Sequence, residues 1–326
     1  RLAAGVRLAD FHRYRGFHHS ILGRVLRSEY HGLTAAVPNI GQVLSGLEHV
    51  TFQVAEVKTG ERTKKAPLPF TTSTLQQEAS KTLNFSTQKT MSLAQQLYEG
   101  IDIKGNGTVG VITYLRTDST RISEEAQKNT RAYIEEQYGK NYVSFGSSTK
   151  KSGKKIQDAH EAIRPTDISR TPAALKESLT RDQFRLYQLI WKRFAASQMA
   201  DAVYETSSAK IDGGDYRFTM SASRLSFDGF LSVYVQEEEK EESGQLLKGL
   251  SKDMTLELNA LDSQQHFTQP PAHYTEAALV KTLEELGIGR PSTYAPTITT
   301  IIARRYVSRE NRNLYLTELG EVVNNM

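Results

Sequence analysis

Helical sequence periodicity fills the middle of this 326-residue chain, and β-prone sequence lies on both sides of it. Apolar and polar residues alternate at 50–57, before the helical block. After the block, four runs favour strands: 203–211, 216–222, 229–235 and 255–259. Residues 212–215 predict a hairpin turn between the first two of these runs. This order predicts a β domain that is interrupted by an inserted helical domain.

The helical block covers about residues 74–200. Its helices begin at recognisable cap residues, which are the capping boxes at 73–76 and 180–183, Ser123 before two glutamates, and the pair Thr171-Pro172. Helical patterns return after residue 275. A hairpin around 310–313 and a helix from 317 then complete a winged-helix-like pattern.

We therefore predict an α+β multidomain fold. Residues 36–73 and 201–274 would form the β-rich domain, residues 74–200 the inserted helical domain, and residues 275–326 a further helical domain. Residues 1–35 hold four of the eight histidines without a steady apolar period, and we assign them neither a fold nor a function.

The composition excludes several classes of function. The chain has no cysteine, which removes disulfides, thiol catalysis and cysteine-based zinc sites. Its apolar runs are far too short for a membrane span, and its first residues show no secretory pattern, so we expect a cytoplasmic protein without a membrane partner. The net charge of +4 and the pI near 9.0 are compatible with nucleic acid but do not require it.

The segment 110–122 has the most informative chemistry. Its β-branched residues favour an extended backbone, in which Tyr114, Arg116 and Asp118 would share one face. A phenol is a poor nucleophile at neutral pH, and a fixed guanidinium can stabilise its phenolate or bind a phosphate oxygen. The pattern suits a tyrosine that attacks a phosphodiester, although packing is the commoner role of a tyrosine.

Two neighbouring segments concentrate positive charge. On a helical turn at 157–165, His160 and Arg164 would lie on one face and could hold a phosphate, although a salt-bridged surface helix is the simpler interpretation. A Gly/Ser-rich segment with four lysines precedes them and includes Lys154 and Lys155. These lysines could meet phosphates, or they could belong to an ordinary solvated loop.

A third cluster lies at the start of the predicted helix 292–302. Arg290, Ser292 and Thr293 stand where free backbone N–H groups favour an anion. Ser292 could equally be a plain helix cap, and the two roles are compatible. Arg304 follows about three turns along the same helix.

Together these segments resemble the type IA topoisomerases, the family of bacterial DNA topoisomerase I. Five stretches match in the order of that family: PFTTSTLQQEA at 69–79, TMSLAQQLYEG at 90–100, ITYLRTDST at 112–120, QDAHEAIRPT at 157–166 and GIGRPSTYA at 287–295. The resemblance covers about residues 40–326. It implies an enzyme that cuts and rejoins one DNA strand without ATP and relaxes negative supercoils.

The resemblance also implies roles for single residues. Tyr114 falls on the nucleophile that forms a 5′-phosphotyrosyl bond, and Arg116 on the arginine that positions the scissile phosphate. His160 matches a histidine of the active-site region. The DNA-contacting positions of the family fall on Arg290, Ser292, Thr293 and Arg304. The β domain would be the arch of a toroidal enzyme, and the inserted helical, winged-helix-like domain would be its gate.

The metal site of the family is the main departure. Type IA enzymes bind Mg²⁺ through an acidic cluster in a Toprim domain, and no such cluster is recognisable in this sequence. We therefore expect a fragment that binds no metal itself and relaxes DNA poorly alone. We further expect a monomer that is associated with the nucleoid and has single-stranded DNA as its partner.

Two other functions compete with this interpretation. Tyrosine recombinases and type IB topoisomerases also combine Tyr, Arg and His, but their nucleophile follows the Arg/His cluster, whereas Tyr114 precedes His160 and Arg164. The second alternative is a non-catalytic module that binds single-stranded DNA through electrostatic phosphate contacts.

Overall fold

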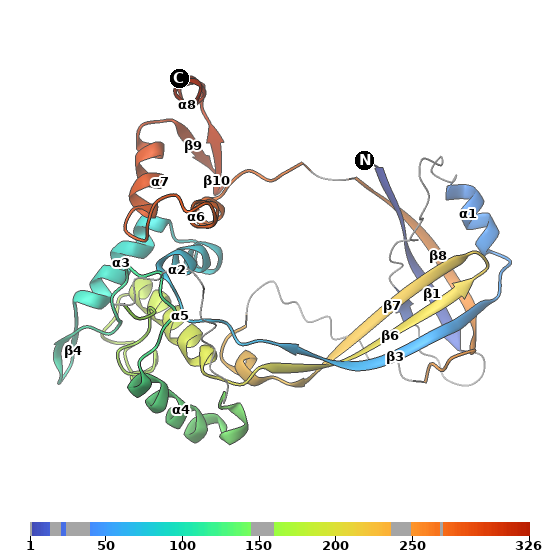
Figure 1. Cartoon of the computed structure of the whole chain (residues 1–326), viewed down its shortest axis with the longest axis horizontal. Helices are drawn as coiled ribbons and strands as arrows, with labels where there is room; N and C mark the ends of the chain where they lie inside the picture. The colour runs from blue at the N-terminus through green and yellow to red at the C-terminus, as the bar shows by residue number, and fades with distance from the viewer. Residues whose placement is uncertain (1, 14–20, 24–39, 145–159, 236–248, 268–269) are drawn as a thin grey trace. The chain divides into compact units, whose positions relative to one another are not determined.

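The computed structural model describes residues 2–13, 21–23, 40–144, 160–235, 249–267 and 270–326 (Figure 1). The chain divides into two compact units. Unit 1 comprises Arg1–Lys64, Val203–Phe227 and Glu239–Pro271, and unit 2 comprises Lys65–Ala202, Asp228–Glu238 and Ala272–Met326. The fold is mixed α and β, as the sequence predicts.

Unit 1 is built on a six-stranded sheet in the order β2-β1-β8-β3-β6-β7. Its strands are β1 (Leu2–Arg13), β2 (Ile21–Gly23), β3 (Phe52–Lys64), β6 (Ala202–Gly213), β7 (Tyr216–Phe227) and β8 (Thr255–Phe267). Antiparallel pairing joins β1 to β2 and β8, β3 to β8, and β6 to β7. Strands β1 and β2 lie within residues 1–35, for which no fold was predicted.

The core of unit 1 lies against this sheet and includes the short helix α1 (Ile40–Leu47). The buried members are Leu47, Phe52, Val54, Ala209, Ile211, Phe218, Met220 and Leu256. The predicted turn at 212–215 joins β6 and β7 into a long hairpin, with Gly214 at a positive φ of 59° (Figure 1).

Unit 2 contains the remaining helices. They are α2 (Thr72–Glu78), α3 (Thr87–Glu99), α4 (Glu124–Tyr138), α5 (Arg181–Ser197), α6 (Glu276–Glu285), α7 (Tyr294–Ala303) and α8 (Glu318–Asn325). The predicted starts of α4 at Ser123 and of α5 at the Thr180–Gln183 capping box are confirmed. None of the helices within the described ranges is long and apolar enough to cross a membrane.

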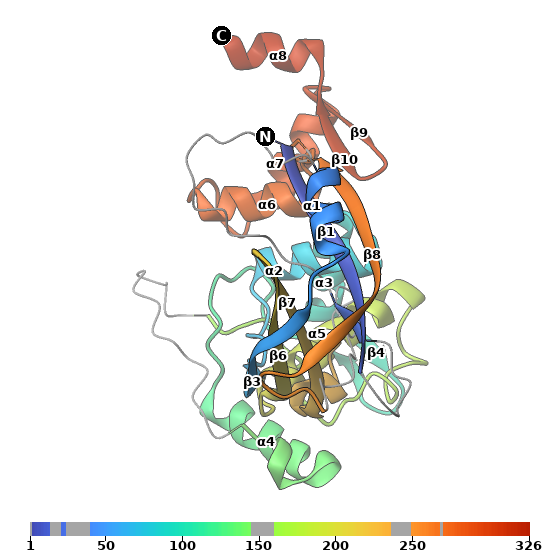
Figure 2. The ribbon, with the colours of Figure 1, turned by 90° about the vertical axis from the view of Figure 1, so that its right-hand side faces the viewer.

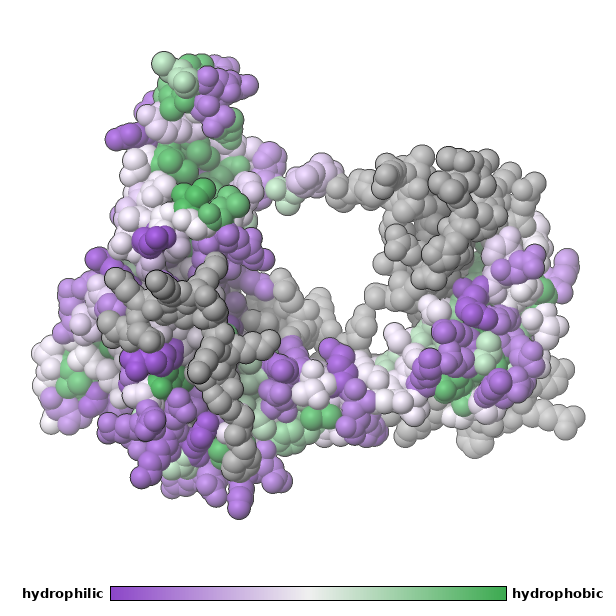
Figure 3. All heavy atoms as spheres, viewed as in Figure 1, coloured by the Kyte–Doolittle hydropathy of each residue, from purple (hydrophilic) through white to green (hydrophobic). Residues whose placement is uncertain are grey.

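Two small antiparallel hairpins complete unit 2. One consists of β4 (Ile101–Ile103) and β5 (Gly107–Val109), and the other of β9 (Val307–Glu310) and β10 (Asn313–Leu316). Helix α8 follows the second hairpin, as predicted (Figure 2). Apolar side chains are visible on the surface of this C-terminal part (Figure 3), where the large exposed ones include Leu286, Ile288, Leu316, Leu319, Val322 and Val323.

Three local predictions are wrong, and each concerns a helix cap or a glycine. The first capping box joins Thr71 and Thr74 rather than residues 73–76. Thr171-Pro172 starts a series of turns and not a regular helix. The predicted strand at 229–235 is a 3₁₀ turn, because Gly229 has a φ of 48° and turns the chain beneath the Ala200 carbonyl.

Candidate active site

The segment that carries Tyr114 forms no regular strand and bends at Leu115 and Arg116. Backbone hydrogen bonds hold it to α3 (Val111 N–H to the Leu97 carbonyl, 2.8 Å) and to α2 (Thr72 N–H to the Thr117 carbonyl, 2.9 Å). Residues 162–166 supply further bonds: Thr113 N–H to the Arg164 carbonyl (2.9 Å), Thr166 N–H to the Val111 carbonyl (3.0 Å) and Ala162 N–H to the Arg121 carbonyl (2.8 Å). These bonds produce one isolated bridge, between Ile112 and Pro165, in place of the expected strand.

The predicted alternation of side chains is nevertheless confirmed. Leu115 and Thr117 are buried, at 1% and 2% exposure, and Thr117 is bonded through its N–H to the Thr72 hydroxyl at 2.8 Å. Tyr114, Arg116 and Asp118 are exposed on the opposite face. The buried residues anchor the segment and so present a phenol, a guanidinium and a carboxylate to solvent together.

The ring of Tyr114 lies between two other rings. The imidazole of His160 stacks on it, with ring centroids 5.3 Å apart and planes inclined by 29°. The ring of Tyr98, near the end of α3, meets it edge to face at 5.5 Å and 69°. These contacts restrict the orientation of a side chain that is 37% exposed, and so direct its hydroxyl.

The contact between Tyr98 and Tyr114 was not predicted, because the sequence places Tyr98 only in a helical pattern. The sequence signal for this contact is Gly110. A Cβ on Gly110 would lie 2.5 Å from the Tyr98 carbonyl oxygen, so only glycine lets the Tyr114 segment pass so close to the last turn of α3. This close approach brings Tyr98 and Tyr114 together.

The predicted helical turn around His160 is wrong. Residues 157–159 lie outside the described residues, and residues 160–165 are extended, with bridges at Ile163 and Pro165. Proline disfavours helical backbone in the residue before it, which here is Arg164.

Arg164 is consequently not paired with His160 in a phosphate cradle. Its side chain is 12% exposed and forms an ion pair with Glu161 at 2.6 Å. Its guanidinium also donates to the Pro165 carbonyl at 3.0 Å. These internal partners give Arg164 a structural task, and its predicted contact with DNA stays a prediction.

Tyr114 and Arg116 open into a groove with a volume of about 630 Å³. One wall is a face of α3, from which Gln88, Met91, Ser92 and Gln95 project. The other wall is the start and one face of α7, formed by Pro291, Ser292, Ala295, Pro296, Thr299 and Thr300. The lining mixes amides, hydroxyls and apolar groups, which suits a strand with both phosphates and bases.

The turn before α7 brings the third predicted cluster to this groove. The Arg290 N–H donates to the Thr293 hydroxyl at 2.8 Å, and the Thr293 N–H donates back to the Arg290 carbonyl at 2.8 Å. Thr293, not Ser292, occupies the N-cap position, and no side chain caps the helix. Ser292 therefore lines the groove instead of capping α7, and Arg290 is exposed beside it.

Tyr294, the first residue of α7, is a buried phenol. Burial raises the pKa of Tyr294, and the negative charges of Glu284 and Asp118 raise this pKa further, while Arg290 opposes them.

The remaining predicted DNA contacts are Arg304, Lys154 and Lys155. Arg304 is exposed at the C-cap of α7, at the other end of that helix from Ser292, and it does not line the groove. Lys154 and Lys155 lie outside the described residues.

A metal ion requires a cluster of ligands. Within the ranges that the structure describes, no three His, Asp or Glu side chains come together in a way that could hold one.

Comparison with known proteins agrees with the residue-level matches. The family model of DNA topoisomerase matches residues 36–326. The structure of full-length topoisomerase I from Thermotoga maritima resembles this chain with a TM-score of 0.80 and 35% sequence identity, over 100% of this chain and 51% of that one. This chain thus spans about half the length of that relative. The chain belongs to the type IA DNA topoisomerase family.

Proposed function

We propose that this chain contributes the nucleophile and part of the DNA groove to a type IA topoisomerase, and that Tyr114 attacks a single strand of DNA. The observation that carries the proposal is the position of Tyr114 and Arg116 in one groove, opposite Ser292 of the α7 wall. A phenol and a permanent cation then face the same space, where a phosphodiester can lie between them.

The chemistry is a transesterification. The Tyr114 oxygen forms a bond to phosphorus, the bond from phosphorus to the 3′ oxygen breaks, and the departing oxygen takes up a proton while the phenol loses one. The strand then has a free 3′ hydroxyl and a 5′-phosphotyrosyl end. The reverse reaction reseals the strand, and because one phosphoester replaces another, it needs no ATP.

The neighbouring groups have complementary tasks in this scheme. Arg116 binds a non-bridging phosphate oxygen and stabilises the charge that develops there. His160 and Tyr98 keep the Tyr114 ring in its attacking orientation, since each contacts the ring directly. Arg290, Ser292 and Thr293 hold the strand farther along the groove, and Asp118 also contacts the DNA.

The wider architecture follows the family. Unit 1 would be the arch, the helical residues 74–200 the gate, and residues 275–326 part of the DNA-binding wall of a toroidal, monomeric, nucleoid-associated enzyme. Mg²⁺ would be held by a separate Toprim domain. On this view the chain relaxes supercoiled DNA poorly until that domain is supplied.

The decisive experiment combines the chain with a separately made Toprim fragment, Mg²⁺ and end-labelled single-stranded DNA. We expect a covalent adduct through the 5′ phosphate at the break, which disappears in Tyr114→Phe. The matched control is Tyr274→Phe, because Tyr274 is also exposed, at 50%, but does not line the groove. An adduct through a 3′ phosphate would contradict the proposal and favour a type IB-like enzyme.

The second candidate is a module that only binds single-stranded DNA, through electrostatic phosphate contacts. This candidate predicts salt-dependent binding that Tyr114→Phe leaves intact, and no adduct even in the presence of the Toprim fragment.

A further inference from the structure

Two carboxylates of α6 contact the first turns of two other helices in unit 2. Glu276 Oε2 accepts hydrogen bonds from the Thr87 N–H at 2.8 Å and the Thr87 hydroxyl at 2.9 Å, and Thr87 is the first residue of α3. Glu284 Oε2 accepts a hydrogen bond from the Ser73 hydroxyl at 2.6 Å, in the first turn of α2. Helix N-termini favour negative charge, so both contacts are electrostatically matched.

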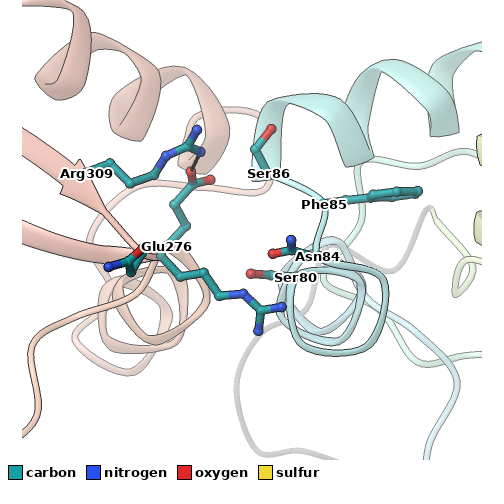
Figure 4. Close-up of a pocket in the computed structure, with 8 residues that line it drawn as sticks. Ser80, Asn84, Phe85, Ser86, Glu276 and Arg309 are labelled. Carbon is teal, nitrogen blue, oxygen red and sulfur yellow. Dashed lines mark hydrogen bonds and ion pairs between the residues drawn. The ribbon is translucent and has the colours of Figure 1, made fainter.

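Of these two contacts, the one made by Glu276 is more shielded from solvent. The side chain of Glu276 is 8% exposed, and its second oxygen accepts a hydrogen bond from Arg309 Nη1 at 2.8 Å. Figure 4 shows the Glu276 side chain extending toward Arg309, with Ser86 of the α3 cap close by. A buried carboxylate needs such partners, because losing them leaves an uncompensated charge.

The same contact borders a cavity of about 410 Å³, which Asn84 (Figure 4) and Arg312 also line. Arg309 has a side-chain exposure of 51%. Solvent therefore reaches one side of the ion pair, which keeps this contact sensitive to salt.

Helix α6 is joined to α7 by an apolar cluster. Val280 of α6 is fully buried and packs with Tyr294 and Ile298 of α7, which are 6% and 1% exposed. The two helices therefore pack together, so contacts that hold α6 in place also hold α7 in place.

This arrangement connects α6 to the groove. Helix α3, whose first residue donates hydrogen bonds to Glu276, forms one wall of the Tyr114 groove, and α7 forms the other. We propose that Glu276 and Glu284 are positioning residues that set the spacing between these two walls through α2 and α3. Their consequence for DNA cleavage rests on the proposed function, but the spacing itself does not.

Distance measurement tests the spacing directly. Ser92→Cys on α3 and Thr300→Cys on α7 place one thiol on each wall, and the chain contains no other cysteine. Spin labels on these thiols should give a single narrow distance distribution. Adding Glu276→Gln and Glu284→Gln together should lengthen and broaden it. Glu285→Gln should not change it, because Glu285 is an exposed residue of the same helix that pairs with Lys281 at 3.9 Å.

Cleavage provides the second readout. In the adduct assay with the Toprim fragment, the Glu276→Gln/Glu284→Gln chain should form Tyr114 adduct about tenfold more slowly, since small misplacements of reacting groups are costly. Its affinity for single-stranded DNA should change much less, because no groove residue is altered. Circular dichroism confirms that the variant is folded.

The outcomes separate the two proposals. An unchanged distance distribution in the folded double variant overturns the positioning role, whatever the chemistry. Absence of adduct in the unaltered chain overturns the proposed function, while the distances still decide the role of the two carboxylates. Equal losses of affinity and adduct rate would mean that the variant damages DNA binding in general, and would also overturn the positioning role.

Discussion

The imidazole of His160 lies face to face with the phenol ring of Tyr114, at a centroid distance of 5.3 Å. This contact joins residues 46 positions apart, and it exists because residues 162–166 and the Tyr114 segment bond to each other, as in the Thr113 N–H to Arg164 carbonyl bond. The candidate nucleophile is thus oriented by a ring and not only by its own strand.

We expect His160 to contribute to adduct formation mainly through its ring contact with Tyr114. An aromatic pair contributes about 0.5–1.5 kcal/mol beyond burial, so His160→Ala should slow adduct formation up to about tenfold. His160→Phe should recover most of that loss. The measurement is single-turnover adduct formation with the Toprim fragment present. A phenylalanine variant as slow as the alanine variant would instead make the imidazole charge the property that matters.

The positions of two arginines predict different contributions to DNA binding. Arg290 is exposed beside the groove and Arg304 lies at the far end of α7. Each phosphate contact by a single strand contributes about 0.7 to the slope of log affinity against log salt. We expect Arg290→Ala to reduce this slope by about that amount, and Arg304→Ala to reduce it by less.

Fluorescence anisotropy with labelled single-stranded DNA at several salt concentrations measures these slopes. The control is Arg181→Ala, which removes an exposed arginine that does not line the groove, at the start of α5. If Arg181→Ala changes the slope as much as Arg290→Ala, the α7 wall has no special part in binding.

Gly229 should tolerate substitution worse than a glycine with a similar backbone. Gly229 and Gly105 both have positive φ, 48° and 86°, and a left-handed residue other than glycine costs about 1–2 kcal/mol. A Cβ at Gly105 meets nothing within 4 Å, whereas at Gly229 it overlaps the Ala200 and Asp201 carbonyls. Urea unfolding should show Gly229→Ala to be less stable than Gly105→Ala by about 1–3 kcal/mol. Equal losses would mean that the backbone relaxes around residue 229.

Local rules predicted most helices and hairpins because their determinants are close in sequence. Ser123 before α4 and the Thr180–Gln183 box before α5 act within one turn, and the 212–215 hairpin needs only its own residues. The common face of Tyr114, Arg116 and Asp118 follows from alternation alone, even where no ladder forms.

The rest of the site depends on contacts that one segment cannot encode. Pro165 makes residues 160–165 extended, which separates Arg164 from the role expected for it on a helix. The groove needs α7 to lie opposite Tyr114, and this depends on packing across 178 positions of sequence, from Tyr114 to Ser292.

The last prediction concerns the pH dependence of unit 1. Glu56 on β3 pairs with Lys210 on β6 at 2.8 Å and with Lys58 at 2.7 Å, and these lysines lower its pKa from 4.5 to about 2. A carboxyl whose folded pKa is depressed stabilises the fold above its unfolded pKa, and this stability is lost as the pH falls through the folded pKa. Because the Glu56 side chain is partly exposed, at 35%, the effect should be small and should shrink with added salt. Chemical unfolding should therefore show the native chain to be more stable than Glu56→Gln at neutral pH. This difference in the free energy of unfolding should decrease as the pH falls from 4.5 to about 2.

The control, Glu61→Gln, changes an exposed glutamate on the same strand and should show no such dependence. A difference between the native chain and Glu56→Gln that stays constant across this pH range would contradict the assignment of the lysine pairs to stability.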